Sequence, residues 1–325
     1  MSGLPPQLFR NPIDLLELLC EELELTDTQK LSAERSYNTV SEWLNDRDSA
    51  IARYRPHIHP QGSIALGTTV KPHNRADFDI DLVCLLQVMH GISASELFHL
   101  VYDRLYMHGT YKKMISRKNR CVRLDYEPDY HLDITPAKPH LIGGTHIYVP
   151  DRALATLKDS NPKGYIEWFT TIGHRSPSIR RIMTFANEMT NRATVEPLEL
   201  QQSFEKKPLQ RIVQILKRHR DLYFEKTPDL AVISVIITTL TAMSYNRLIG
   251  TEFATMEDFV EAVVRDLPNG LECRQFGNQV QWWLPNPSSP AENFAEKWNA
   301  EPKKKEAFEI QSRGGVAIGG RLRQL

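Results

Sequence analysis

The sequence from Gln61 to Thr68 reads QGSIALGT, and residues 77–83 follow as DFDIDLV. Side chains alternate between the two faces of a β-strand, so Asp79 and Asp81 are predicted to share one face and the apolar residues between them the other. Two carboxylates held that close repel each other and favour a divalent cation with oxygen ligands. The second stretch therefore predicts a strand that presents a metal-binding pair, with magnesium as the natural ion.

A third carboxylate comes from a predicted β-hairpin. Residues 120–126 and 131–135 each alternate apolar and polar side chains, and a turn separates them. Asp133 lies between two apolar residues, so it belongs to the polar face and is predicted to join Asp79 and Asp81. Three carboxylates can hold two cations on either side of an in-line phosphoryl displacement.

The Gly62-Ser63 step fits the same chemistry. Glycine lets the backbone approach a phosphate closely, and the serine hydroxyl and neighbouring amides can donate to its oxygens. A Gly-Ser pair alone is a weak signal, and an acidic strand is most often a solvated edge. The coincidence of this turn with three carboxylates on polar strand faces favours metal-assisted nucleotidyl transfer.

These motifs resemble the polymerase-beta-type nucleotidyltransferase pattern: Gly62-Ser63, Asp79-Ile80-Asp81 and LDITPA at 132–137. Two later strings, NPKGYIEWF at 161–169 and LQRIVQILKRHRD at 209–221, are similar to bacterial relatives of cyclic GMP-AMP synthase and oligoadenylate synthase. These bacterial relatives make cyclic oligonucleotides in antiphage signalling. The resemblance spans roughly residues 55–245.

The resemblance implies an α+β fold: a polymerase-beta-like mixed sheet with helices, a helical lobe, and a cleft between them. Residues 1–160 would form the catalytic core with N-terminal helices. Residues 161–325 would form the helical nucleotide-binding lobe with a flexible C-terminal tail. A length of 325 residues also exceeds the usual size of a single core, which favours two lobes.

The resemblance also assigns residues to the site. The carboxylates would bind two Mg²⁺ ions, with Mn²⁺ as the alternative, and other residues would hold the donor triphosphate. The metal ligands and catalytic residues are Asp79, Asp81 and Asp133; the nucleotide-binding residues are Gly62, Ser63, Lys217 and Ser234. By itself, the basic run around Lys217 is most often a solvated face, and Ser234 can equally bond to a carbonyl one helical turn earlier.

The implied reaction joins ribonucleoside triphosphates, ATP among them, into a cyclic di- or trinucleotide second messenger and releases pyrophosphate. A regulatory protein encoded nearby is an expected partner. The residues leave the nucleobases, ring size, linkage and cyclic or linear product open. Two rival functions are another nucleotidyltransferase of the superfamily, acting on RNA, protein or a small-molecule hydroxyl, and a non-enzymatic nucleotide-binding scaffold.

Composition narrows the classes of function. Forty basic residues balance forty acidic ones, which argues against constitutive DNA binding. The four cysteines lack the spacing of a zinc site or a disulfide framework. The N-terminus has no signal-peptide pattern and the apolar run at 230–237 is too short for a bilayer, so a cytoplasmic protein without membrane contact is expected.

Sequence patterns also predict individual helices. Proline at the first position predicts one from Asn11-Pro12, and a capping box from Ser93 to Glu96 predicts another that ends near 107. Apolar periodicity predicts a helix from about Thr28, with Leu31 on its buried stripe, and others near 208–224 and 230–243. We further expect a charged helix over 292–308 after a proline-rich loop, and a flexible basic tail over 313–323.

Overall fold

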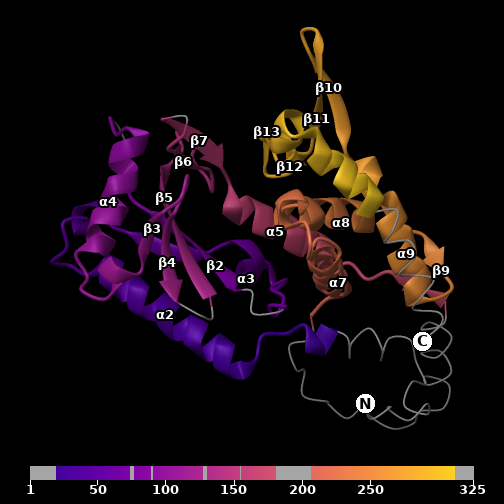
Figure 1. Ribbon diagram of the computed structural model, residues 1–325, viewed down its shortest axis with the longest axis horizontal. Coiled ribbons are helices and arrows are strands. Elements are labelled where there is room, and N and C mark those ends of the chain that lie inside the picture. The colour runs from indigo at the N-terminus through magenta and orange to yellow at the C-terminus, as the bar shows by residue number, and fades with distance from the viewer. Residues whose placement is uncertain are drawn as a thin grey trace. The chain divides into compact units, whose positions relative to one another are not determined.

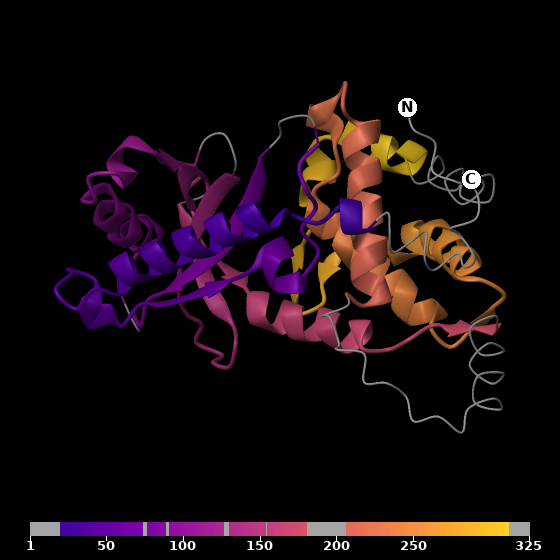
Figure 2. The ribbon, with the colours of Figure 1, turned by 90° about the horizontal axis from the view of Figure 1, so that it is seen from below.

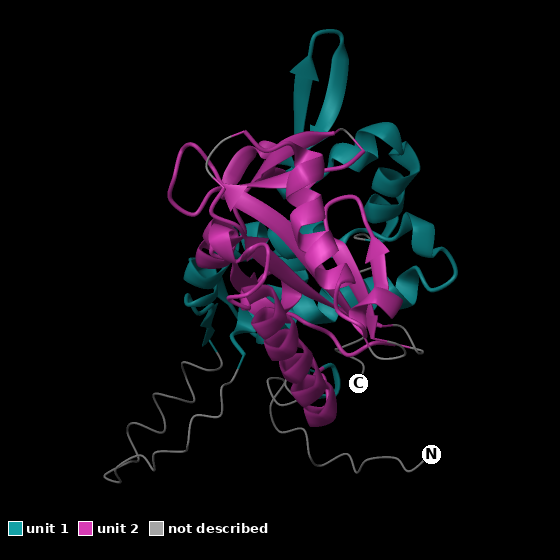
Figure 3. Cartoon of the chain, turned by 90° about the vertical axis from the view of Figure 1, so that its left-hand side faces the viewer, with its two compact units in different colours: residues 1–23, 169–284, 293–325 teal, residues 24–168, 285–292 magenta. Residues whose placement is uncertain are grey.

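The computed structural model describes residues 20–73, 77–88, 91–126, 130–153, 155–180 and 206–311. Two compact units emerge, coloured separately in Figure 3: unit 1 comprises residues 1–23, 169–284 and 293–325, and unit 2 comprises residues 24–168 and 285–292. Residues 11–19 of the helix predicted from Asn11 and the tail predicted over 313–323 lie outside the described residues, whereas residues 20–22 of that predicted helix are helical. The predicted domain boundary after residue 160 stays a prediction.

Unit 2 is built on a mixed sheet. Its described strands are β1 (His57–Pro60), β2 (Phe78–Leu85), β3 (Ile115–Arg117), β4 (Val122–Tyr126), β5 (Tyr130–Pro139), β6 (Ile147–Asp151) and β7 (Thr156–Ser160). They follow the order β1-β2-β5-β4-β3, with β6 pairing β5 and β7. The β2–β5 pair is parallel, and β4 and β5 form the predicted antiparallel hairpin.

Two helices bury the apolar face of this sheet. Helix α2 (Asp27–Asn45) lies along the sheet and α4 (Ala94–Tyr106) packs beside it (Figures 1 and 2). Both begin with a capping box, and the one at Ser93 and Glu96 is as predicted. Val40 and Leu44 join the core, but Leu31 is 52% exposed, so its predicted place on the buried stripe is wrong.

Unit 1 is mainly helical. Helix α5 (Pro162–Gly173) crosses the boundary between the units, and α7 (Pro208–Tyr223), α8 (Ser234–Leu248) and α9 (Met256–Asp266) follow. Single turns lie at Pro228–Leu230 and Leu267–Gly270, and β8 (Ser178–Ile179) pairs with β9 (Glu252–Phe253). Strands β10 (Glu272–Phe276) and β11 (Gln279–Trp283) form a hairpin. None of the described helices is long and apolar enough to cross a membrane.

Two predicted helices have different bounds. Helix α8 was predicted from residue 230 but starts at Ser234. Arg220 donates from Nη1 to the carbonyl of Val232 (3.1 Å), and this hydrogen bond holds the residues just before Ser234 extended. The helix predicted over 292–308 is wrong at its start. Residues 285–293 form the short pair β12 (Pro285–Asn286) and β13 (Ser289–Asn293), followed by α10 (Glu296–Ala300) and a helix from residue 302.

The Asn293 side chain explains this difference, and the hydrophobic periodicity of the sequence cannot predict its hydrogen bonds. Asn293 Oδ1 accepts from the backbone amides of Leu284 and Ala295, both at 2.9 Å, so the chain turns back at this point.

The four cysteines are free thiols, with Cys20 and Cys84 buried and Cys273 exposed.

Arg104 fastens α4 to α2 inside unit 2. Its side chain is 7% exposed, donates to the Trp43 carbonyl from Nε (3.1 Å) and Nη2 (2.7 Å), and pairs with Asp46 at 2.9 Å. The guanidinium carbon also lies 3.5 Å from the centroid of the Trp43 ring. Arg104 thus donates to the Trp43 carbonyl in the last turn of α2, where carbonyl groups have no donor within the helix.

We predict that Arg104→Met lowers the free energy of unfolding by about 2–4 kcal/mol, because it removes a buried charged donor while keeping similar volume. Urea denaturation followed by tryptophan fluorescence measures this. The control is Lys30→Met on exposed α2 surface, where we expect a change under about 0.5 kcal/mol. Equal stability of the two variants would contradict the role given to Arg104.

Candidate active site

Strand register brings the predicted carboxylates together. In the parallel β2–β5 pair, Asp81 lies beside Asp133 and Asp79 beside His131. Residues directly opposite one another across a ladder point to the same face, so these side chains share one face of the sheet. The opposite face carries buried apolar residues of the same strands. Asp133 therefore faces the same way as Asp79 and Asp81, as their alternation requires.

Arg123 on β4 occupies the middle of this face. It lies opposite Asp133 in the antiparallel β4–β5 ladder. Its Nε donates to Asp133 Oδ1 and its Nη2 to Asp133 Oδ2, both at 2.7 Å, and Nη2 also reaches Asp79 Oδ1 at 3.1 Å. The hydrogen bonds to Asp133 raise the pKa of Arg123. Arg123 was not among the predicted site residues, although its position between two apolar strand residues places it on the polar face.

His131 stands between two further carboxylates on this face. Its Nε2 lies 3.0 Å from Asp77 Oδ2, and its Nδ1 lies 2.9 Å from Asp125 Oδ1. The second contact is short but lacks hydrogen-bond alignment, so it is not a hydrogen bond. The face thus carries Asp77 and Asp125 beside the two carboxylates that bind the Arg123 guanidinium. Such an arrangement attracts a further cation.

The carboxylates differ in their access to solvent. The Asp79 side chain is 55% exposed, whereas the Asp133 side chain is 13% exposed. Partial desolvation raises the pKa of Asp79, the charge of Arg123 opposes that rise, and the charge of Asp133 adds to it. Asp79 is thus the more solvent-accessible carboxylate of the cluster, and Asp133 is the more desolvated one.

Gly62 lies directly against Asp81. It is the first residue of the short helix α3 (Gly62–Leu66), with φ +61°, and a Cβ atom there would fall 2.2 Å from Asp81 Oδ2. The amide of Gln61 donates to the Asp81 carbonyl at 2.8 Å, which ties this turn to β2. The next residue, Ser63, accepts a hydrogen bond from Thr69 at 3.2 Å. The predicted phosphate turn and a predicted metal ligand therefore adjoin each other.

The donor set suits a hard divalent cation, because it consists of carboxylate oxygens. As they stand, the described residues contain no group of three or more His, Cys, Asp or Glu side chains arranged to hold a metal ion. Both oxygens of Asp133 are engaged by the Arg123 guanidinium. A cationic side chain thus already binds between Asp133 and Asp79, and the residues fit a cation at this place.

The other two predicted nucleotide-binding residues belong to unit 1. Lys217 is 5% exposed on α7, so the alternative that it belongs to a solvated basic face is wrong. Ser234 is the first residue of α8, and its hydroxyl accepts from Arg220 Nη1 at 2.8 Å. Arg220 is a further basic residue in unit 1 that was not among the predicted site residues. The roles of Lys217 and Ser234 toward a nucleotide stay predictions.

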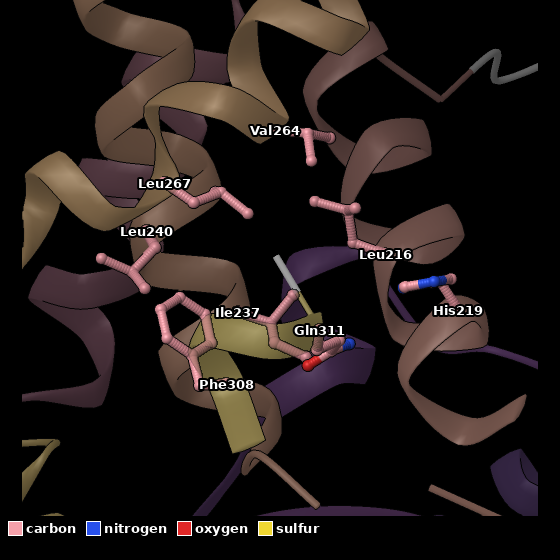
Figure 4. Close-up of a pocket in the computed structure, with 8 residues that line it drawn as sticks. All are labelled: Leu216, His219, Ile237, Leu240, Val264, Leu267, Phe308 and Gln311. Atoms are coloured by element: carbon pink, nitrogen blue, oxygen red, sulfur yellow. The ribbon is translucent and has the colours of Figure 1, made fainter. Parts of the chain in front are cut away.

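Unit 1 also contains a small cavity, shown in Figure 4, whose volume is about 20 Å³. Most of its lining is apolar: Leu216, Ile237, Leu240, Val264, Leu267 and Phe308, with His219 and Gln311. Such a volume holds about one water molecule. This cavity is therefore too small for a nucleotide.

Comparison with known proteins identifies the family. Residues 13–172 match the model of the Second Messenger Oligonucleotide or Dinucleotide Synthetase domain. The chain is 33% identical over 292 residues to a c-di-GMP synthase of Roseivirga ehrenbergii, covering 89% of this chain and 74% of that protein. It is 22% identical over 311 residues to the cyclic dinucleotide synthase CdnG of Bradyrhizobium diazoefficiens, covering 90% of this chain and 72% of that protein.

Solved structures share the fold. The Bradyrhizobium diazoefficiens CD-NTase CdnG in complex with GTP has a TM-score of 0.70 at 18% identity, covering 97% of this chain and 93% of that one. The Escherichia coli CdnC in complex with a HORMA protein has a TM-score of 0.62 at 13% identity, covering 94% and 90%. The predicted α+β class is confirmed. This chain belongs to the bacterial family of nucleotidyltransferase enzymes that synthesise cyclic oligonucleotides.

Proposed function

We propose that this enzyme joins two ribonucleoside triphosphates into a cyclic dinucleotide second messenger and releases pyrophosphate. The observation that carries the proposal is the pairing of Asp81 with Asp133 across parallel strands, on the face that also presents Asp79. GTP is the first substrate we propose, because the relative with 33% identity is named a c-di-GMP synthase. ATP is the second, since the ATP-bound Escherichia coli CdnC has a similar fold.

We propose Mg²⁺ as the physiological ion, two per site, with Mn²⁺ as a substitute, held by Asp79, Asp81 and Asp133. Bound there, the cations would neutralise charge on the triphosphate and ease loss of the acceptor hydroxyl proton. The chain's own groups position the substrates. The amides and hydroxyl of Gly62 and Ser63 donate to the donor phosphates, and Asp133 orients the acceptor hydroxyl.

The reaction proceeds by two equivalent transfers. The acceptor ribose hydroxyl oxygen bonds to the donor α-phosphorus, the bond from α-phosphorus to the bridging oxygen breaks, and pyrophosphate leaves. The hydroxyl proton is lost to the solvent or to a carboxylate of the site. A second transfer within the linear product closes the ring. Lys217 and Ser234 would contact the donor triphosphate.

We also propose a place for this reaction in the cell. The cytoplasm supplies ribonucleoside triphosphates, and the product would act there as a signal in antiphage defence. A regulatory protein encoded nearby would control synthesis. The structure of the related Escherichia coli CdnC with a HORMA protein supports this last point.

The purified enzyme, given Mg²⁺ and all four labelled ribonucleoside triphosphates without any other acceptor, should release pyrophosphate and form a cyclic dinucleotide that contains guanine. Product mass spectrometry and nuclease resistance measure this outcome. Synthesis without an added acceptor excludes the rival that modifies RNA, protein or a small molecule. Turnover that depends on such an acceptor would refute the cyclic dinucleotide assignment.

The double variant Asp79→Asn, Asp81→Asn should lose pyrophosphate release by at least about a thousandfold. Metal ions supply several kcal/mol of transition-state stabilisation, and each 1.4 kcal/mol corresponds to roughly tenfold in rate. The control Glu34→Gln, on exposed α2 surface, should keep the parent rate. Persistent turnover in a folded double variant would show that other residues carry the chemistry.

Gly62→Ala should reduce kcat by about a hundredfold or more, because the added methyl group collides with Asp81 and misplaces a catalytic group. Gly144→Ala is the matched control, since Gly144 has a similar φ of +65° but an added Cβ there would meet no atom within 4 Å. Both variants place alanine at a similar positive φ, so steady-state kinetics separate the effect of that backbone conformation from the collision. Equal activities would contradict the importance of this contact.

A further inference from the structure

Arg123 has a place in the site that the proposed reaction does not use. We propose that Arg123 is a built-in counter-ion, which binds Asp133 and Asp79 in the metal-free enzyme and competes with the divalent cation for them. This inference rests on the proposed function, because it concerns the same carboxylates. Arg123 is on this account a positioning residue that sets the affinity for metal.

The contacts of the guanidinium support direct competition. Two nitrogens of Arg123 donate to the two oxygens of Asp133, both at 2.7 Å, and one of them also donates to Asp79 at 3.1 Å. Bidentate charge-assisted pairs of this kind are among the stronger hydrogen bonds in proteins. The guanidinium and a divalent cation would draw on the same two oxygens of Asp133, and their positive charges would repel each other. Metal binding at Asp133 is therefore weakened as long as Arg123 keeps both hydrogen bonds.

Burial strengthens the ion pair between Arg123 and Asp133. The side chains of Arg123 and Asp133 are 20% and 13% exposed, so solvent screens their interaction little. The two residues are direct partners in the β4–β5 ladder, which fixes their separation. Arg123 also contacts the more exposed Asp79, and it lowers the repulsion between Asp79 and Asp133. Deleting the guanidinium would leave a desolvated carboxylate without its strongest partner.

The contacts of Arg123 and His131 show why Arg123 is the residue that competes with the metal ion. Its neighbour on the face, His131, lies between Asp77 and Asp125. Arg123 instead contacts the two carboxylates that the reaction assigns to metal. The consequence is low metal affinity until a triphosphate brings further negative charge to the face. Arg123 would thereby couple metal loading to nucleotide binding.

The test measures Mn²⁺ binding to the full chain without nucleotide, from the electron paramagnetic resonance signal of free Mn²⁺. Arg123→Gln should bind Mn²⁺ about tenfold more tightly than the parent, which is the order expected when a charged hydrogen-bonded competitor is removed. The same variant should have a lower Tm without metal and a larger rise in Tm on adding Mn²⁺. Arg123→Lys keeps the charge with a single donor group, so it should tighten binding only about twofold.

Arg120→Gln is the matched control. Arg120 pairs with Asp151 at 3.2 Å and lies 3.8 Å from Glu292, so its ion pairs are made away from Asp79 and Asp133. Its Mn²⁺ affinity should equal that of the parent. A lower Tm in Arg123→Gln with unchanged or weaker Mn²⁺ binding would overturn the proposal, because it would leave Arg123 a purely structural role.

The double variant Asp79→Asn, Asp81→Asn separates the two levels of inference. If it loses Mn²⁺ binding while Arg123→Gln binds no more tightly than the parent, only the role of Arg123 is refuted. If it binds Mn²⁺ as well as the parent, the ions bind elsewhere, and the proposed metal site falls together with the counter-ion. Should Arg123→Gln fail to fold, Arg123→Lys provides the comparison, and an affinity below that of the parent overturns the proposal.

Discussion

Like-charge repulsion between carboxylates on neighbouring strands is the constraint on which this site depends. The apolar face of β2 and β5 packs against α2 and α4, and strand alternation then forces Asp81 and Asp133 side by side on the other face. A register slip of one residue would expose the apolar face, so core packing fixes the carboxylates together. The hydrophobic core thus holds charges in an arrangement that they would not adopt alone.

The Arg123 guanidinium relieves this repulsion. Arg123 binds the desolvated Asp133 and reaches Asp79, and His131 lies between the two flanking carboxylates. Gly62 leaves room for Asp81 where any larger residue would collide with it. These features explain why a turn with backbone donors and an acidic face can adjoin. Under the proposed function, donors for phosphate and ligands for a cation would meet at one place, which is what nucleotidyl transfer requires.

Local patterns predicted much of this structure, and long-range pairing accounts for what they missed. Alternation identified the strand with Asp79 and Asp81 and the hairpin that carries Asp133, and the capping box at Ser93 marked the start of α4. The alignment of Asp81 with Asp133 depends on pairing between distant segments. Arg123 was missed for the same reason, since only the pairing of β4 with β5 places it opposite Asp133.

The measurement that tests the central claim most directly is anomalous diffraction from crystals grown with Mn²⁺ and a non-hydrolysable triphosphate. We predict manganese peaks in contact with Asp79, Asp81 and Asp133, with at least one oxygen of Asp133 released by Arg123 and phosphate beside Gly62 and Ser63. Bound nucleotide with manganese distant from all three carboxylates would contradict the account.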